Sequence, residues 1–206
     1  MKRLVLIVLI ALAAVTVWAD SPLTSTRFWP IYNFSCDKLT FPMYQQFEKY
    51  GWSPEVMDDL TSQEISVEKR LCLVNLVSWN FGGQNHYEGL VTYYMARNNL
   101  TDREAAFREM DGKMLAVFAY VKAMDNYFDV TEARQLSSEA VLRAPDSRAV
   151  AMIDALIAAQ MAMDSDWLEV YHVCQRVVEK TYADNDFCDA AVYAIMEYIN
   201  LYAGEN

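Results

Sequence analysis

Apolar residues recur three and four positions apart along most of the chain, the spacing that places them on one face of an α-helix. Strand-like alternation of apolar and polar positions is nearly absent. No proline occurs between Pro54 and Pro145, so helices in that stretch are not forced to break. The pattern predicts an all-α protein with nine candidate spans, of which we expect seven or eight to form helices: residues 40–50, 54–60, 62–80, 86–98, 102–128, 130–144, 147–163, 166–181 and 187–202.

Helix start signals divide this apolar pattern. Ser53 precedes Pro54, a combination suited to an N-cap followed by the first helical residue. Capping-box spacing occurs at Thr61/Glu64, Thr101/Glu104 and Asp129/Glu132. Paired glycines and asparagines at residues 80–85 indicate a loop between two helices.

Residues 1–19 have the features of a secretory signal peptide. A basic head at Lys2 and Arg3 precedes an apolar stretch from Leu4 to Val17, and we expect cleavage after Ala19. The apolar stretch is shorter than the roughly 20 residues that span a bilayer. We therefore expect a periplasmic or secreted protein that has no membrane span after signal cleavage.

The mature chain divides into two parts by composition. Residues 20–39 mix prolines with aromatic side chains and lack a sustained helical period, which predicts an irregular N-terminal arm that packs along the first helices. Residues 40–206 form a single helical domain, because their length suits one hydrophobic core and a hydrophobic content of 54% for the whole chain argues against disorder.

The charge of the chain limits its partners. The net charge is −11, and it becomes −13 once Lys2 and Arg3 leave with the signal peptide. Such a surface repels the phosphates of nucleic acids and anionic membranes. A basic protein or a cation is attracted instead.

All four cysteines lie in the mature part, where an oxidising compartment permits disulfides. Cys36, in the N-terminal arm, reaches Cys72 most freely, and we predict a disulfide between them. Buried thiols that pack as small apolar groups are the alternative.

An internal repeat organises the second half of the chain. Ala123 to Phe128 aligns with Ala162 to Trp167 at an offset of 39 residues, and each segment closes one predicted helix and opens the next. Helix pairs of about 40 residues that stack in a row are typical of an α-solenoid. We therefore expect antiparallel helix pairs stacked as a short α-solenoid, with a helical bundle as the alternative.

Small residues at Ala133 and Ala140, followed by Pro145, have the spacing of the second helix of a tetratricopeptide repeat. The chain resembles that family over about one repeat, and the architecture that we expect is a tetratricopeptide- or HEAT-like solenoid. The resemblance implies stacked helix pairs. The segment Asp20 to Thr26 also resembles the start of a group of exported bacterial helical proteins, a likeness that implies no activity.

Catalytic and metal-binding patterns are missing. The chain has only His86 and His172, and the single Glu-x-x-His at Glu169 lacks the second copy that a di-iron bundle needs. No Gly-x-Ser-x-Gly elbow or phosphate-binding loop occurs. We predict no metal and no cofactor, and we favour a protein that is not an enzyme.

Aromatic and acidic residues at the two repeated turns are the candidate binding residues, because equivalent positions of stacked repeats line one edge of the surface. They are Asp125, Tyr127, Phe128, Asp164 and Trp167. The alternative is that these side chains fill the core and that Asp164 caps the next helix.

Two functions are therefore compatible with the sequence. The first is binding of an unidentified protein or peptide. The second is a carboxylate-dependent hydrolase of cell-envelope polymers, which needs a deep cleft holding two acids about 5 to 10 Å apart.

Overall fold

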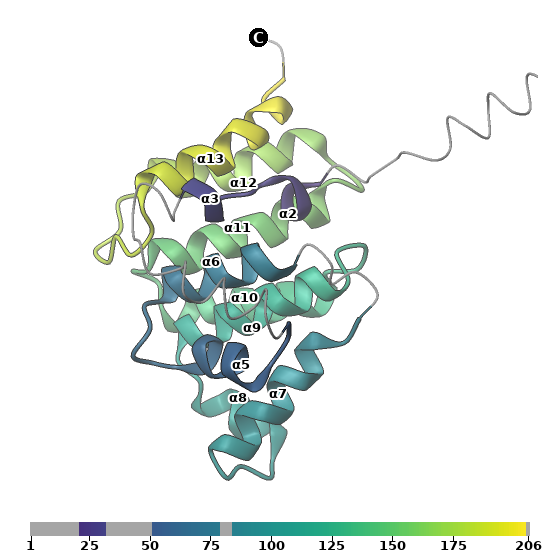
Figure 1. Cartoon of the computed structure of the whole chain (residues 1–206). Coiled ribbons are helices and arrows are strands. Elements are labelled where there is room, and N and C mark those ends of the chain that lie inside the picture. The colour runs from purple at the N-terminus through teal and green to yellow at the C-terminus, as the bar shows by residue number, and fades with distance from the viewer. Residues whose placement is uncertain (1–20, 32–50, 79–83, 205–206) are drawn as a thin grey trace, which may run out of the picture.

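Helices that pack against one another form most of the part of the protein that the structure describes (Figure 1). The computed structural model describes residues 21–31, 51–78 and 84–204. Helices account for most of these residues and no strand occurs among them, which confirms the all-α prediction. The helices are α2 (Pro22–Ser25), α3 (Trp29–Ile31), α5 (Pro54–Thr61), α6 (Val67–Val77), α7 (His86–Arg97), α8 (Arg103–Glu109), α9 (Gly112–Asp125), α10 (Thr131–Arg143), α11 (Arg148–Ala162), α12 (Trp167–Glu179) and α13 (Asp189–Ile199), followed by the 3-10 turn η3 (Asn200–Tyr202).

The most extensive contacts are between α9 and α10 and between α11 and α12, and α10 packs against α11 to join the two pairs. Figure 1 shows these pairs stacked between α7 and α8 at one end and α13 at the other. Buried side chains from Leu23 to Ile199 belong to one hydrophobic cluster. Stacking therefore continues one core through the described part of the chain.

Helix α9 lies at the centre of that core, in contact with α2, α6, α7, α10 and α11. Nearly every side chain from Gly112 to Asp125 is buried as a result. At its start α9 approaches the end of α10 so closely that a Cβ on Gly112 would lie 2.5 Å from the carbonyl oxygen of Ala140 and 2.7 Å from the Cβ of Ala144. The small side chains of α10 thus allow the close approach that the sequence indicates.

Two predicted helices have different limits in the structure. The span 102–128 is two helices, because Asp111 ends the extended break after α8 and caps α9 by accepting a hydrogen bond from the backbone N–H of Met114, 2.7 Å away. The span 62–80 starts later, at Val67. Thr61 does not cap it, since its hydroxyl donates to the carbonyl of Met57 in the preceding helix.

The described part of the N-terminal arm is more ordered than the sequence indicates, and it contacts the last helices as well as the first. Helix α2 packs against α9, α11 and α13, and α3 packs against α6 and α13 (Figure 1). Leu23 and Phe28 are fully buried. The ring of Phe28 lies edge-on to that of Phe187, with centroids 5.3 Å apart. The arm therefore links α6 and α9 to α11 and α13 through the core.

The cysteines differ from the prediction. Cys72 is a buried free thiol, which corrects its predicted pairing with Cys36. Cys174 is also free and buried, whereas Cys188 is disulfide-bonded. Burial raises the pKa of the Cys72 thiol and raises that of Cys174 to about 12. The alternative of buried thiols therefore holds for two of the four cysteines.

Some predictions lie outside the described residues: the signal peptide at 1–19, the helix at 40–50 and the position of Cys36. Among the helices that the structure describes, none combines the length and the apolar character that a membrane crossing requires.

Candidate functional site: the groove along helix α11

Helix α11 buries one face against α9 and α2 and exposes the other. Ala151, Asp154, Ala158 and Met161 are partly or largely exposed, and their spacing of three and four residues puts them on the same helix face. Helices α10 and α12 pack on either side of α11. Two cavities open along this face, and we call them together the α11 groove.

The larger cavity has a volume of about 300 Å³. Small and aliphatic side chains from three helices form its apolar lining, namely Val141 and Pro145 at the end of α10, Ala151, Ala155 and Ala158 on α11, and Val173 and Val177 on α12. Alanines on α11 leave this space empty because larger side chains at the same positions would fill it. The remaining lining residues are Arg134, Asp154, Arg176, Lys180 and Tyr182.

A compact ion pair lies in the wall of this cavity. The Arg134 guanidinium contacts the Asp154 carboxylate, and the Ser137 hydroxyl donates to the same carboxylate oxygen at 2.7 Å. Burial raises the pKa of Asp154, although the Ser137 hydrogen bond and the Arg134 charge act in the opposite direction. The two charges offset each other, so this part of the groove carries little net charge.

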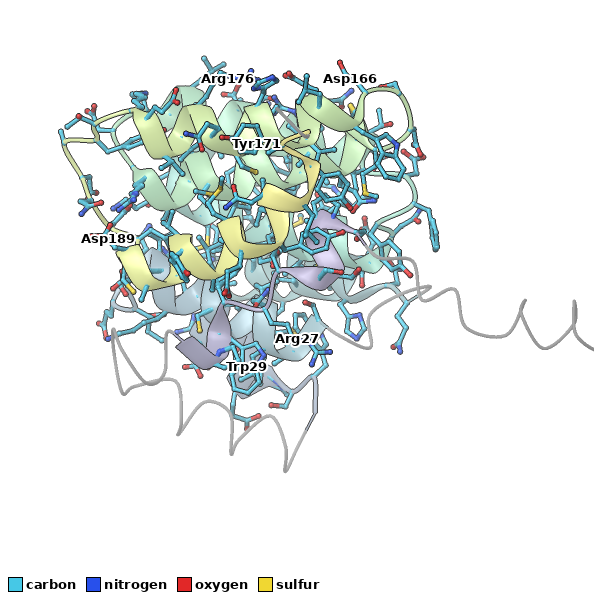
Figure 2. The ribbon with its side chains drawn as sticks, turned by 90° about the horizontal axis from the view of Figure 1, so that it is seen from above. Arg27, Trp29, Asp166, Tyr171, Arg176 and Asp189 are labelled. Carbon is cyan, nitrogen blue, oxygen red and sulfur yellow. The ribbon has the colours of Figure 1, made fainter. Side chains whose placement is uncertain are left out.

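Lys180 provides the positive charge at one end of the groove. Its ammonium donates to the Pro145 carbonyl at 3.4 Å and lies 4.7 Å from the centroid of the Tyr182 ring. Within the described ranges no carboxylate pairs with it. Arg176, one turn earlier on α12, is instead held by Glu169 at 2.7 Å. Figure 2 shows α12 between Asp166 at its start and Arg176 toward its end.

The smaller cavity, of about 120 Å³, lies at the opposite end of α11. Its lining residues are Tyr127, Phe128, Asp129, Val130, Thr131, Gln160, Met161 and Asp164. The Tyr127 and Phe128 rings lie 4.4 Å apart between centroids, and Phe128 is 73% exposed. An exposed aromatic pair beside carboxylates is a surface that suits a cationic group.

Two polar groups of the smaller cavity have no partner among the residues that the structure describes. The exposed Asp164 carboxylate makes no ion pair or hydrogen bond there. The side-chain amide oxygen of Gln160 is buried and accepts no hydrogen bond. Buried acceptors without a donor are rare in folded proteins, so a buried water is expected beside this oxygen.

The structure brings three of the five predicted binding residues together. Tyr127, Phe128 and Asp164 line the smaller cavity, while Trp167 packs against Tyr202 with ring centroids 5.8 Å apart. The cap of α12 is Asp166, which accepts from the backbone N–H groups of Leu168 and Glu169, and not Asp164. The Asp164 carboxylate is therefore not committed to holding the helix.

Asp125 has a different environment from Asp164, its counterpart in the repeat. It is only 6% exposed, accepts a hydrogen bond from the backbone N–H of Tyr87 at 2.7 Å and contacts Nδ1 of His86 at 2.8 Å. These contacts attach the end of α9 to the start of α7. Asp125 is thus a structural anchor in the described fold.

A third cavity, of about 190 Å³, contains several acids but each has a local partner. Asp125 holds His86 and Tyr87, and Glu132 pairs with Lys122 at 2.7 Å. Asp129 accepts from Thr131, and this hydrogen bonding lowers the pKa of its carboxyl. The described residues contain no cluster of three or more His, Cys, Asp or Glu side chains arranged for a metal ion.

No family model matches the chain, and neither the curated proteins nor the solved structures show a significant match. The geometry of the groove is therefore the evidence on function that this protein offers.

Sequence reasoning missed the larger half of the groove. Arg134 and Arg176 look like solvated helix charges, and the alanines of α11 look like ordinary helix formers. The available signal was the spacing of Ala151, Ala155 and Ala158 on one helix face between two helices that carry cations. Only the packing of α10 and α12 turns that spacing into a cavity.

Proposed function

We propose that this protein binds a peptide segment of a partner protein and that the segment lies in the α11 groove. The observation that carries the proposal is the cavity of about 300 Å³, which has an aliphatic lining and polar walls between α10 and α12. Cavities of this kind accommodate apolar side chains while polar groups at the walls set orientation. Repeat proteins commonly bind peptides on such extended surfaces between stacked helices.

The arrangement that we propose is tetratricopeptide-like. Ala133 and Ala140 are buried on α10, where it faces α9, and Pro145 follows the end of α10 before α11 begins. These are the positions on which the sequence resemblance rests. The signal peptide that the sequence predicts at residues 1–19 supports a periplasmic or secreted location, so we propose that the partner is an exported protein or a domain facing the same compartment.

A carboxylate-dependent hydrolase receives less support. That mechanism needs one acid that holds a proton and a second that stays ionised beside it. The acids of the cavity near Asp125 are engaged by His86, the Tyr87 backbone, Lys122 and Thr131. Hydrogen bonds lower the pKa of Asp129, which disfavours it as a proton donor.

The test is to fill the groove. Peptides of about seven residues are selected from a display library against the mature protein, and one selected peptide is synthesised with a fluorescent label. We expect Ala158→Trp, which places an indole in the larger cavity, to weaken binding at least about tenfold in fluorescence anisotropy.

The matched control is Ala105→Trp, because Ala105 is also a partly exposed helical alanine but lies on α8, away from the groove. Its affinity for the peptide stays within about twofold of the unsubstituted protein. Equal affinity for Ala158→Trp and the control, in proteins that unfold at similar temperatures, contradicts the proposal. Failure to select any peptide contradicts it as well.

A further inference from the structure

Opposite charges stand at the two ends of the α11 groove. Lys180 contacts the Pro145 carbonyl, just before α11 begins, and Asp164 follows the end of α11. Neither side chain has an ion-pair partner among the described residues. Helix α11 runs from Arg148 to Ala162, and the rise of an α-helix, about 1.5 Å per residue, puts the two ends of the groove roughly 20 to 28 Å apart.

The Asp164 end fits a cationic side chain. The exposed Phe128 ring and the adjacent Tyr127 ring provide aromatic faces, and Asp129 adds a second carboxylate. A lysine ammonium or an arginine guanidinium is attracted by both features.

The Lys180 end fits a carboxylate. Lys180 is an accessible ammonium beside the apolar lining, on a chain whose net charge is −11. Between the two ends, the Arg134–Asp154 pair is internally compensated, and Ala155 and Ala158 present methyl groups. The middle of the groove therefore suits an uncharged, aliphatic segment.

We infer that the groove recognises a dipolar peptide, with a basic side chain at the Asp164 end, an acidic side chain at the Lys180 end and aliphatic residues between them. This inference rests on the proposed function and specifies its ligand. An extended chain advances about 3.3 Å per residue, so the two charged side chains are separated by about six to eight residues. The charge pattern sets the orientation of the peptide in the groove.

Three labelled peptides with blocked ends test the inference. All have the same length and the same alanine and leucine residues between two terminal positions, which are lysine and glutamate, two lysines, or two glutamates. We expect the lysine–glutamate peptide to bind tightest, by about two- to fivefold over each of the others, because exposed ion pairs contribute modestly.

Substitutions at the two ends make the test specific. Asp164→Asn is expected to weaken the lysine–glutamate and the two-lysine peptides and to leave the two-glutamate peptide unchanged. Lys180→Gln is expected to weaken the lysine–glutamate and the two-glutamate peptides and to leave the two-lysine peptide unchanged. Both residues are exposed, so neither change disturbs the core. Glu197→Gln and Arg108→Gln, exposed charges on α13 and α8, serve as controls that leave all three affinities unchanged.

The outcomes separate the two proposals. One outcome is that the three peptides bind equally, and that Ala158→Trp weakens their binding while Asp164→Asn and Lys180→Gln do not. This result overturns the charge pattern and leaves peptide binding in place. Loss of selectivity at only one end also overturns the dipolar pattern. If none of the three peptides and no library peptide binds, peptide binding in the groove is overturned with it.

Discussion

The side-chain amide of Asn75 donates a hydrogen bond to the hydroxyl of Tyr120, 2.8 Å away, in the core between α6 and α9. The same amide group donates to the carbonyl of Thr26 and accepts from the backbone N–H groups of Phe28 and Trp29, at 3.1 to 3.2 Å. One buried carboxamide thus attaches the N-terminal arm to the central helix. Its four bonds use the full capacity of the amide.

We expect Asn75→Ala to lower the free energy of unfolding by about 2 to 4 kcal/mol, because it leaves buried backbone groups of the arm without partners. Tyr120→Phe removes only one of the four bonds and is expected to cost about 1 kcal/mol. Urea unfolding followed by circular dichroism measures both. Similar losses for the two variants would show that Asn75 does not hold the arm.

A second prediction compares two glycines in helices. Gly112→Ala places a Cβ 2.5 Å from the Ala140 carbonyl oxygen, and we expect it to destabilise the fold by about 1 to 3 kcal/mol through this overpacking. Gly89→Ala in α7 meets nothing closer than 3.7 Å, so the better helix propensity of alanine is expected to stabilise by roughly 0.5 to 1 kcal/mol. Opposite signs in thermal unfolding support the close approach of α9 and α10. A stabilising Gly112→Ala would rule it out.

A third prediction concerns the loop between α12 and α13. The largely buried Asp186 carboxylate accepts from the Ser147 hydroxyl at 2.7 Å and the Ala149 N–H at 3.0 Å, and it pairs with Lys113 at 2.9 Å. Asp186→Ala is expected to cost about 2 to 3 kcal/mol and to speed proteolysis between residues 180 and 188.

Asp184→Ala is the matched control for the loop. Its side chain pairs only with Lys113 among the described residues and is half exposed, while its backbone bonds to Asp146 and Arg148 do not depend on the side chain. We expect a loss below about 1 kcal/mol. Equal sensitivity of the two variants to protease would contradict the special role of Asp186.

A fourth prediction concerns thiol reactivity. Cys72 and Cys174 are buried, and burial raises the pKa of each thiol, so little thiolate is present at pH 8. Iodoacetamide is expected to leave both unlabelled in the native protein and to label both in guanidinium, as read by peptide mass spectrometry. Cys188, which is disulfide-bonded, needs a reductant before it reacts. Rapid labelling of native Cys72 would contradict its burial.

The sequence predicts the helices of this protein well where the apolar period is long. The spans predicted at 86–98, 130–144, 147–163 and 166–181 agree with α7, α10, α11 and α12 within two residues at each end. The prediction fails at the break between α8 and α9. Apolar residues recur at helical spacing both before and after Met110 and Asp111, so the spacing gives no sign of the break. The cap at Asp111 is a local hydrogen bond from the Met114 N–H, which the spacing of apolar residues does not reveal.

The candidate site shows the same division. The repeated turns are visible in the sequence, and three of their five selected residues meet in one cavity. The alignment treats Asp125 and Asp164 as equivalent, yet one is buried against α7 and the other is exposed. Local sequence does not encode that difference, because it depends on which distant helix covers each turn.

The amino-acid sequence by itself determined the helical class, the small residues at the helix contact and the acidic charge, because these follow from composition and from spacing within single helices. Tertiary structure alone decided that α10 and α12 flank the alanines of α11, that Asn75 meets the arm, and that Lys180 and Asp164 stand at opposite ends of one groove. These relations join residues far apart in the chain. They arise only when the apolar faces of several helices pack into one shared core.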